Sequence, residues 1–312
     1  ISPISERGDK GGFSSPKQVN TLKILDPACG SGSFLLGAYQ FLLDWHLKYY
    51  TNELKTNDKL LKQKQPPVYI NDKGNYLLTT SEKKNILLHN IFGVDIDPQA
   101  VEVTKLSLML KVLEGESTQT LNNELKLFRE RALPDLSNNI KCGNSLIGPD
   151  FYDQMEMNFL DDEEKLRINV FDWNAEFKDI MSNGGFDVVI GNPPYVRQEL
   201  ISEFKSYFEN NYKVYSGIAD LYSYFIEKAV NLLKDGGYFS YIVANKWMRA
   251  NYGEPLRKWL KQQNLIEIID FGDLPVFKGA TTYPCIINIT KSKITAEINI
   301  VEMKSLEFNS LI

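Results

Sequence analysis

The segment DVVIGNPPY, residues 187–195, carries the strongest chemical signal in the chain. The β-branched apolar run at 188–190 predicts a buried parallel strand that stops abruptly. Two prolines follow Asn192, and they fix φ and remove two backbone hydrogen-bond donors. The Asn192 amide and the Pro193 carbonyl are therefore presented in one stiff geometry beside the aromatic face of Tyr195. Such a loop predicts a site that holds a planar amine.

A glycine-rich turn, DPACGSGSF, lies far upstream at residues 26–34, between a short apolar run and an amphipathic segment. Gly30 and Gly32 stand where a backbone must approach a ligand closely, and Asp26 offers an acceptor for a cation or an amine. The resemblance to the dinucleotide fingerprint is superficial, because Leu35 replaces its third glycine and no phosphate-loop lysine follows. The alternative is a tight structural connection without a ligand.

Two further strand ends carry polar side chains. Asp95 closes a predicted strand at 91–94, where a carboxylate can accept both hydroxyls of a ribose. Asp97 precedes Pro98, which is typical of a helix N-cap, so we interpret Asp97 as a cap only. Asn144 follows a third predicted strand, and its amide can pair with an adenine edge, although a turn-forming Asn explains it nearly as well.

Strand, loop and helix alternate along most of the chain. This predicts an α/β, doubly wound, mostly parallel, seven-stranded sheet with ligands at the carboxyl ends of its strands. Residues 284–289 and 294–301 have no helix between them, which predicts a terminal antiparallel hairpin. One helix is expected to follow the glycine turn and to end near residue 50. Others are expected at 100–112, 222–233 and 254–262, with another helix and a loop within 114–136. The Asp-Gly-Gly at 235–237 is expected to stop the helix before it.

The predicted organisation is one large domain, 21–312, preceded by a polar N-terminal arm, 1–20. Insertions are expected at about 51–85 and at the acidic stretch 150–179. The 312 residues are 43% hydrophobic and 24% charged, which is ordinary for a soluble protein, and no run approaches the length of a membrane span.

Cysteine and histidine usage limits the chemistry. The three cysteines, Cys29, Cys142 and Cys285, are far apart, which argues against a disulfide framework and favours a reducing cytoplasm. With two histidines, a metal site or a Ser-His-Asp triad is poorly provided for, and no metal is expected. The net charge of -5 implies that any nucleic-acid contact is regional or is completed outside this chain.

Taken together, the motifs resemble S-adenosylmethionine-dependent amino-methyltransferases, specifically adenine-N6 DNA methyltransferases of the gamma motif order. The modification modules of fused type II restriction-modification enzymes look most similar, over about residues 14–289. DPACGSGSF matches the family's methionine-binding motif, and NPPY matches its catalytic motif. The resemblance implies a class I, Rossmann-like methyltransferase fold, S-adenosylmethionine as cofactor, and double-stranded DNA whose adenine is flipped out of the stack.

The resemblance also implies site residues. Tyr195 and Phe277 would stack on the base, with an ordinary core Phe as the alternative for Phe277. Ser15 and Pro16 look like the remnant of a Thr-Pro motif, and Asn144 stands where the family usually has Asp. Cys29 is interpreted as a small packing residue. The catalytic residues are Asn192, Pro193, Pro194 and Tyr195, and the cofactor-binding residues are Ser15, Asp26, Pro27, Ala28, Cys29, Gly30, Gly32, Phe34, Asp95, Ile96, Asn144 and Ser145.

The expected chemistry is positioning without a covalent intermediate. An exocyclic adenine amine is a poor nucleophile, because its lone pair is delocalised into the ring. If the Asn192 oxygen and the Pro193 carbonyl accept its two N–H groups, the nitrogen moves toward tetrahedral geometry and its lone pair points at the methyl sulfonium.

Two alternatives remain open. One is the same chemistry on an RNA base or on a protein glutamine amide. The other is a non-catalytic binding module with a methyltransferase fold, against which the intact NPPY and glycine turn argue. By family resemblance, a target-recognition domain is expected after residue 312 and, as in fused enzymes, a nuclease before residue 1.

Overall fold

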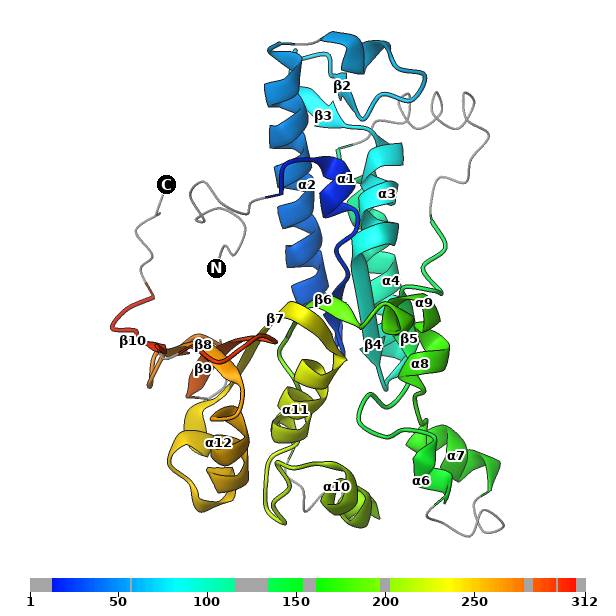
Figure 1. The fold of residues 1–312 in the computed structure, drawn as a ribbon. Coiled ribbons are helices and arrows are strands. Elements are labelled where there is room, and N and C mark those ends of the chain that lie inside the picture. The colour runs from blue at the N-terminus through cyan, green and yellow to red at the C-terminus, as the bar shows by residue number, and fades with distance from the viewer. Residues whose placement is uncertain are drawn as a thin grey trace.

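A computed structural model describes residues 13–56, 58–115, 134–153, 161–196, 203–277, 283–295 and 297–306. Its centre is a sheet with the strand order β10-β8-β9-β7-β6-β1-β4-β5 (Figure 1). The strands are β1 (Ile24–Asp26), β4 (Ile91–Asp95), β5 (Ile140–Cys142), β6 (Phe186–Gly191), β7 (Leu233–Ala244), β8 (Asn264–Asp270), β9 (Pro284–Thr290) and β10 (Asn299–Glu302).

The sheet is mostly parallel, as predicted, and β9 is antiparallel to both of its neighbours, β7 and β8. Two details differ from the expectation. Among the described residues the sheet has eight strands, one more than the seven expected, and β10 does not form a hairpin with β9 but pairs in parallel with β8. The hairpin prediction was wrong because apolar alternation indicates a strand without indicating its partner.

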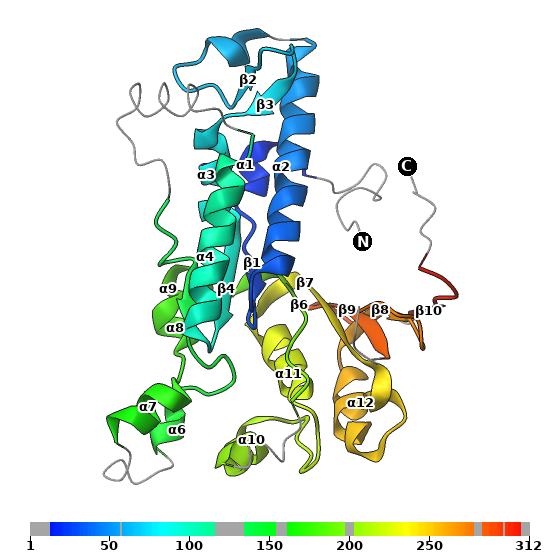
Figure 2. The same cartoon turned by 180° about the vertical axis from the view of Figure 1, so that it is seen from behind.

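Helices cover both faces of the sheet (Figures 1 and 2). One face carries α2 (Ser33–Leu54), α3 (Thr80–Asn90) and α4 (Pro98–Leu113), which enclose a buried cluster that includes Leu35, Tyr39, Ile86 and Leu108. The other face packs an aromatic-rich cluster against α8 (Trp173–Glu176), α9 (Lys178–Ser182), α10 (Lys205–Asn211), α11 (Tyr222–Leu232) and α12 (Glu254–Leu260). The fold therefore has the three layers that a doubly wound sheet requires.

The chain crosses from one half of the sheet to the other between β1 and β6. From β1 it moves outward to β4 and β5, then returns to place β6 on the opposite side of β1. In open α/β sheets this switch point opens a crevice at the carboxyl ends of the strands. The glycine turn after β1 and the NPPY loop after β6 are therefore neighbours.

The expected insertions have structure of their own. The first contains η1 (Asp58–Lys62) and a hairpin of β2 (Val68–Ile70) with β3 (Tyr76–Leu78), and its Val68 and Leu78 are buried against the α2 cluster. The acidic stretch folds into α6 (Asp150–Asp153), α7 (Asp162–Ile168), α8 and α9. The helix and loop expected within 114–136 lie largely outside the described residues.

The ends of two elements also differ from the prediction. The first twelve residues of the expected arm, 1–20, lie outside the described residues. The helix α1 (Pro16–Val19), within the expected arm, packs on the domain, and Val19 is only 1% exposed. Residues 235–237 do not end α11: the helix stops at Leu232 and β7 begins directly afterwards. Gly236, at φ 80°, lies within a stretch of β7 where the register with β6 shifts, as in a β-bulge. Within the described parts of the chain, no helix is long and apolar enough to cross a membrane.

Candidate active site

Hydrogen bonds to β4 and α4 fix the shape of the glycine turn after β1. The Cys29 amide donates to the Val94 carbonyl (3.0 Å), and the Thr104 hydroxyl donates to the Gly30 carbonyl (2.7 Å). Gly30 and Gly32 have φ of 52° and 82°, in the left-handed region that favours glycine. A Cβ at Gly32 would lie 2.8 Å from the Thr104 side chain, whereas one at Gly30 would meet nothing within 4 Å. The turn is therefore closely packed against Thr104 at Gly32, whereas the space beside Gly30 is open and leaves room for a ligand.

Asp95 joins this turn to the end of β4. One carboxylate oxygen accepts the Gly30 amide (2.8 Å), and the other accepts the Asp97 amide (3.0 Å). The prediction for Asp97 is confirmed, because its carboxylate accepts the Gln99 amide as the N-cap of α4. Ile96, between them, is 49% exposed. Asp95 is thus held rigidly beside the open side of Gly30, and its ribose role stays a prediction.

Asp26 is almost completely enclosed. It is 2% exposed, it accepts the Ala28 amide (3.0 Å), and a Cβ at Gly191 would lie 2.7 Å from its carboxylate. Burial raises the pKa of Asp26 to about 7, and the Asp95 charge adds to the rise. Asp26 therefore lies between the glycine turn and Gly191, the last residue of β6 before the NPPY loop. Among the described residues, no ion pair includes its carboxylate.

The β5 turn uses its polar groups internally. The Asn144 side-chain oxygen accepts the Leu146 amide (3.1 Å), which is the turn-forming alternative raised above. Ser145 is 4% exposed and its hydroxyl donates to the Pro27 carbonyl (2.6 Å), so it braces the β1 turn. Cys29 is 5% exposed and packs near Gly93, as expected for a small packing residue. Ser145 is thus placed as a support beneath the turn.

Ser15 is the predicted cofactor residue that the fold does not bring to this edge. It precedes α1, and the side chain of Asn90, the last residue of α3 directly before β4, donates to the carbonyls of Val19 and Leu22 just before β1. These contacts lie at the amino ends of the strands. Figure 1 shows α1 beside the middle of α2 and the upper part of α3. Phe34, 38% exposed, is instead in the first turn of α2, at the carboxyl edge.

The side-chain oxygen of Asn192 is the atom of the NPPY loop that most directly indicates a ligand. Its side-chain oxygen is buried, yet within the part of the chain that the structure describes it has no hydrogen-bond partner. Pro193 is buried and Pro194 is exposed. An orphaned buried acceptor costs about 1–3 kcal/mol, so such groups are rare unless a ligand completes them. The Asn192 oxygen is thus an acceptor without a donor among the described residues, at the position where the sequence predicted an acceptor for an amine.

Tyr195 is fixed at the mouth of the same loop. Its hydroxyl donates to the Ile242 carbonyl (3.4 Å), and its ring lies 6.0 Å from that of the buried Tyr222. The Leu221 amide donates to the Val196 carbonyl (2.8 Å), which ties the loop to the start of α11. Tyr195 remains 37% exposed, so one of its faces is available for stacking.

Phe277 is half-buried in the segment after β8, at the same edge of the sheet. Sequence reasoning missed the residues that organise this segment. The Asn245 side chain, directly after β7, donates to the Asp270 carboxylate (2.8 Å), which also accepts the Gly272 amide (3.0 Å). The signal was available, since Asn245 and Asp270 are polar residues at the ends of two predicted strands.

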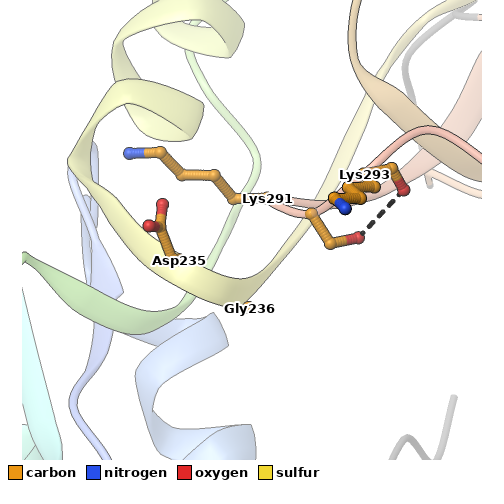
Figure 3. A pocket seen from close by; sticks show the side chains of 5 residues that line it. Asp235, Gly236, Lys291 and Lys293 are labelled. Carbon is orange, nitrogen blue, oxygen red and sulfur yellow. Dashed lines mark hydrogen bonds between the residues drawn. The ribbon is translucent and has the colours of Figure 1, made fainter.

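A surface hollow of about 450 Å³ lies away from this site, at the amino end of β7. Figure 3 shows Lys291 extending beside Asp235. Its ammonium donates to the carbonyls of Asn231 and Leu233, at the end of α11, where a cation is favoured. Ser292 donates to the Lys293 carbonyl (3.5 Å). This lysine supports the fold, and the hollow shares no residue with the NPPY loop or the glycine turn.

Two solved structures show the same architecture. The type IIL restriction-modification enzyme MmeI, in complex with DNA, superposes with a TM-score of 0.58 at 17% identity, over 94% of this chain and 34% of MmeI. The type ISP restriction-modification enzyme LlaBIII, bound to DNA, gives 0.55 at 14% identity, over 94% of this chain and 18% of LlaBIII. The fold is that of class I S-adenosylmethionine-dependent methyltransferases.

Curated relatives are nearer in sequence. The type II restriction enzyme and methyltransferase RM.Eco57I of Escherichia coli is 34% identical over 283 residues, which are 88% of this chain and 25% of that protein. The type II methyltransferase M.BstVI of Geobacillus stearothermophilus is 26% identical over 284 residues, 89% of this chain and 38% of M.BstVI. The chain thus spans well under half the length of either relative.

Family comparison covers the catalytic loop and the cofactor turn in two overlapping parts. The N-6 DNA Methylase family matches residues 14–131, which contain the glycine turn and Asp95. The Eco57I restriction-modification methylase family matches residues 89–277, which contain Asn144, NPPY and Phe277. Since this second match covers more than half of the chain, the protein belongs to the Eco57I restriction-modification methylase family.

Proposed function

We propose that this domain transfers the methyl group of S-adenosylmethionine to the N6 amine of an adenine flipped out of double-stranded DNA. The observation that carries the proposal is the buried side-chain oxygen of Asn192, which has no hydrogen-bond partner in the described parts of the chain and lies across the β1–β6 switch point from an open glycine turn. The family supports the reaction, and the names of its relatives support a place in a restriction-modification system.

The residues of the NPPY loop bind and orient the amine. The Asn192 oxygen and the Pro193 carbonyl accept its two hydrogens, which weakens conjugation of the nitrogen lone pair with the ring. The loop is held from both sides: the Val196 carbonyl accepts the Leu221 amide at the start of α11, and the Tyr195 hydroxyl donates to the Ile242 carbonyl of β7. Little reorganisation is therefore needed when the base enters. Tyr195 and Phe277 are proposed to stack on the flipped base.

The residues of the β1 and β4 turns fit S-adenosylmethionine. Space above Gly30 admits a ligand against the backbone, Asp26 offers its buried carboxylate to a cationic amine, and Asp95 offers acceptors to ribose hydroxyls. Ile96 and Phe34, both partly exposed, supply apolar cover. The bound cofactor would supply an electrophilic methyl group on a sulfonium. Ser15 is not proposed as a ligand, and Ser145 is proposed as a support for Pro27.

Parts of the full-length protein beyond this chain complete the proposal. Because the chain spans 25% of RM.Eco57I, we propose that target recognition, and any nuclease, lie elsewhere in the polypeptide. The recognised base sequence is then set mainly by groove contacts outside the domain.

The test is transfer of labelled methyl groups from S-adenosylmethionine by the full-length protein. Duplex DNA, RNA and protein are offered separately, and methylated DNA is digested to nucleosides. We expect label in DNA alone, as N6-methyladenine. Label in RNA or in protein glutamine would replace the substrate class, and no transfer to any acceptor would favour a binding module.

A further inference from the structure

A short helical turn after β7 presents two cations at the edge of the candidate site. This turn is η4 (Asn245–Met248), and it carries Lys246, while Arg249 follows as its C-cap. Both side chains are exposed. The amides of Arg249 and Ala250 both donate to the Lys246 carbonyl (3.1 and 2.9 Å). Residues three positions apart across one helical turn lie on the same face. The two cations therefore emerge on the same side of the turn.

The turn is locked from behind. Trp247, between the two cations, is 4% exposed, and Arg257 of α12 donates to the carbonyls of Trp247 and Ala250. A Cβ at Gly253, in η5 (Asn251–Gly253), would lie 2.0 Å from the Trp247 carbonyl oxygen. Such close packing holds the backbone in one conformation, so little ordering entropy remains to be lost when Lys246 and Arg249 bind a partner.

The same turn is joined to the base-binding half of the site. Asn245, its first residue, is bonded to Asp270, which organises the segment before Phe277. On the other side, the Tyr252 hydroxyl donates to the Asp220 carboxylate (3.2 Å) and lies 3.4 Å from the hydroxyl of Tyr222, whose ring packs against Tyr195. The two cations thus stand on a scaffold that continues into both proposed stacking positions.

The charges of Lys246 and Arg249 are not compensated locally. Lys258, on the neighbouring α12, is paired with Glu254 (2.7 Å), but none of the ion pairs among the described residues includes Lys246 or Arg249. The protein as a whole carries a net charge of -5. Two uncompensated cations in an acidic protein, at the edge where a polyanion would arrive, fit a phosphate-binding role.

We propose that Lys246 and Arg249 bind the DNA phosphates beside the flipped adenine. The inference rests on the proposed function and deepens it, because it names two residues of this domain that contact the sugar-phosphate backbone of the DNA. Phosphate contacts fix register and carry no sequence information, so these residues position the duplex over the NPPY loop whichever sequence is recognised.

The test uses the full-length protein and a short duplex that the wild type methylates. Binding is measured over a series of salt concentrations, because each phosphate contact contributes about -0.9 to the slope of log K against log[salt]. In Lys246→Gln/Arg249→Gln we expect the slope to become shallower by about 2, and the KM for DNA to rise at least tenfold with little change in kcat. The exchange Lys246→Arg/Arg249→Lys should restore the slope, which a merely structural defect would not allow.

The matched control is Lys64→Gln/Lys73→Gln, which removes the same charge from two exposed lysines of the β2–β3 region, at the far end of α2 (Figure 1). Its slope should equal that of the wild type. An unchanged slope in the Lys246/Arg249 variant, or an equal change in the control, overturns the inference while leaving the proposed function intact. A wild-type protein that methylates no DNA overturns both.

Discussion

The two halves of the sheet's carboxyl edge differ in how fully their polar atoms are paired. One half, formed by β1, β4 and β5, is proposed to bind the cofactor and is called the cofactor half; its turns bond to one another through Asp95, Thr104 and Ser145. The other half, formed by β6, β7 and β8, is proposed to bind the target base and is called the target half; there the buried oxygen of Asn192 has no partner among the described residues. The cofactor half is completed by the fold, whereas the target half is left for a ligand to complete.

This difference predicts different contributions to the binding free energies of the two ligands. A pre-bonded turn loses little entropy when its ligand binds. An orphaned acceptor destabilises the free protein by about 1–3 kcal/mol and returns that free energy when a donor arrives. The target half should therefore bind a ligand that donates an N–H group to the Asn192 oxygen more tightly than a ligand without such a donor. Asp26 is an exception within the cofactor half, because burial penalises its charged form.

The largest effect is expected at Asp26. Its folded-state pKa, about 7, lies above the ordinary value of 3.8, so the folded state holds a proton that the unfolded state has released. Stability of the cofactor-free protein should therefore be greatest below pH 4 for this group, and should be lost between about pH 4 and 7, by up to the order of 4 kcal/mol. Denaturation of wild type and Asp26→Asn across this range measures the effect.

Asp26→Asn should flatten this pH dependence and also remove the rise of S-adenosylmethionine affinity with pH that a charged Asp26 would give. Asp72→Asn, at an exposed position, serves as the control and should leave both profiles unchanged. A wild-type profile that is already flat between pH 4 and 7 would contradict the assignment of a buried, unpaired carboxyl.

The next effect is expected at Asn192, on the other half. Asn192→Ala removes the unpartnered acceptor, so methyl transfer should fall by about 10²–10³-fold, as for loss of one preorganised hydrogen-bonding group. Cofactor affinity should stay within a few-fold of the wild type, and the free protein should be no less stable, because no bond is lost. Single-turnover transfer, cofactor titration and denaturation measure the three quantities.

Asn174→Ala, at an exposed position on α8, is the matched control for Asn192 and should transfer methyl groups normally. If Asn192→Ala turned over at a near-normal rate, or lost cofactor binding to the same degree as transfer, the two halves would not be separable in function.

A smaller effect is expected at Gly32, where the cofactor half is packed most tightly. Gly32→Ala places a Cβ at φ 82° and 2.8 Å from Thr104, so the turn must shift. Strain of this kind costs about 1–3 kcal/mol, and we expect cofactor affinity to fall at least tenfold. Gly37→Ala is the control, since its Cβ would meet nothing within 4 Å inside α2, and it should be neutral or slightly stabilising. Equal losses in both variants would contradict the role of the turn.

The sequence predicted the parallel core of this fold because its strands and helices have clear periodicity. The strand ends at Asp26, Asp95 and Gly191 lie where the pattern placed them. The alternation of elements predicted a doubly wound parallel sheet but not the order of its strands, which the structure supplies. The pairing of β10 was not predictable in this way, because a strand's partner depends on contacts with residues distant in sequence.

The site was predictable at the level of loops and less so at the level of atoms. NPPY and the glycine turn were found from residue types alone. The inward, bracing hydroxyl of Ser145 and the position of Ser15 near the amino edge depend on side-chain direction and on three-dimensional path, which a motif match does not encode. The Asn245–Asp270 bond was missed because each residue belongs to a different strand end and neither lies in a recognised motif.

The smallest effect is expected at Tyr195, where the target half already has a partner. The Tyr195 hydroxyl donates to Ile242 at 3.4 Å, a long and weak bond, so Tyr195→Phe should keep methyl transfer within a few-fold of the wild type. Tyr195→Ala also removes the exposed ring face, and stacking of a base on an aromatic is worth about 1–3 kcal/mol, so KM for DNA should rise about tenfold or more. Fluorescence of 2-aminopurine at the target position reports whether the base leaves the stack. A Phe variant as impaired as the Ala variant would show that the hydroxyl, rather than the ring, is what the target half requires of this residue.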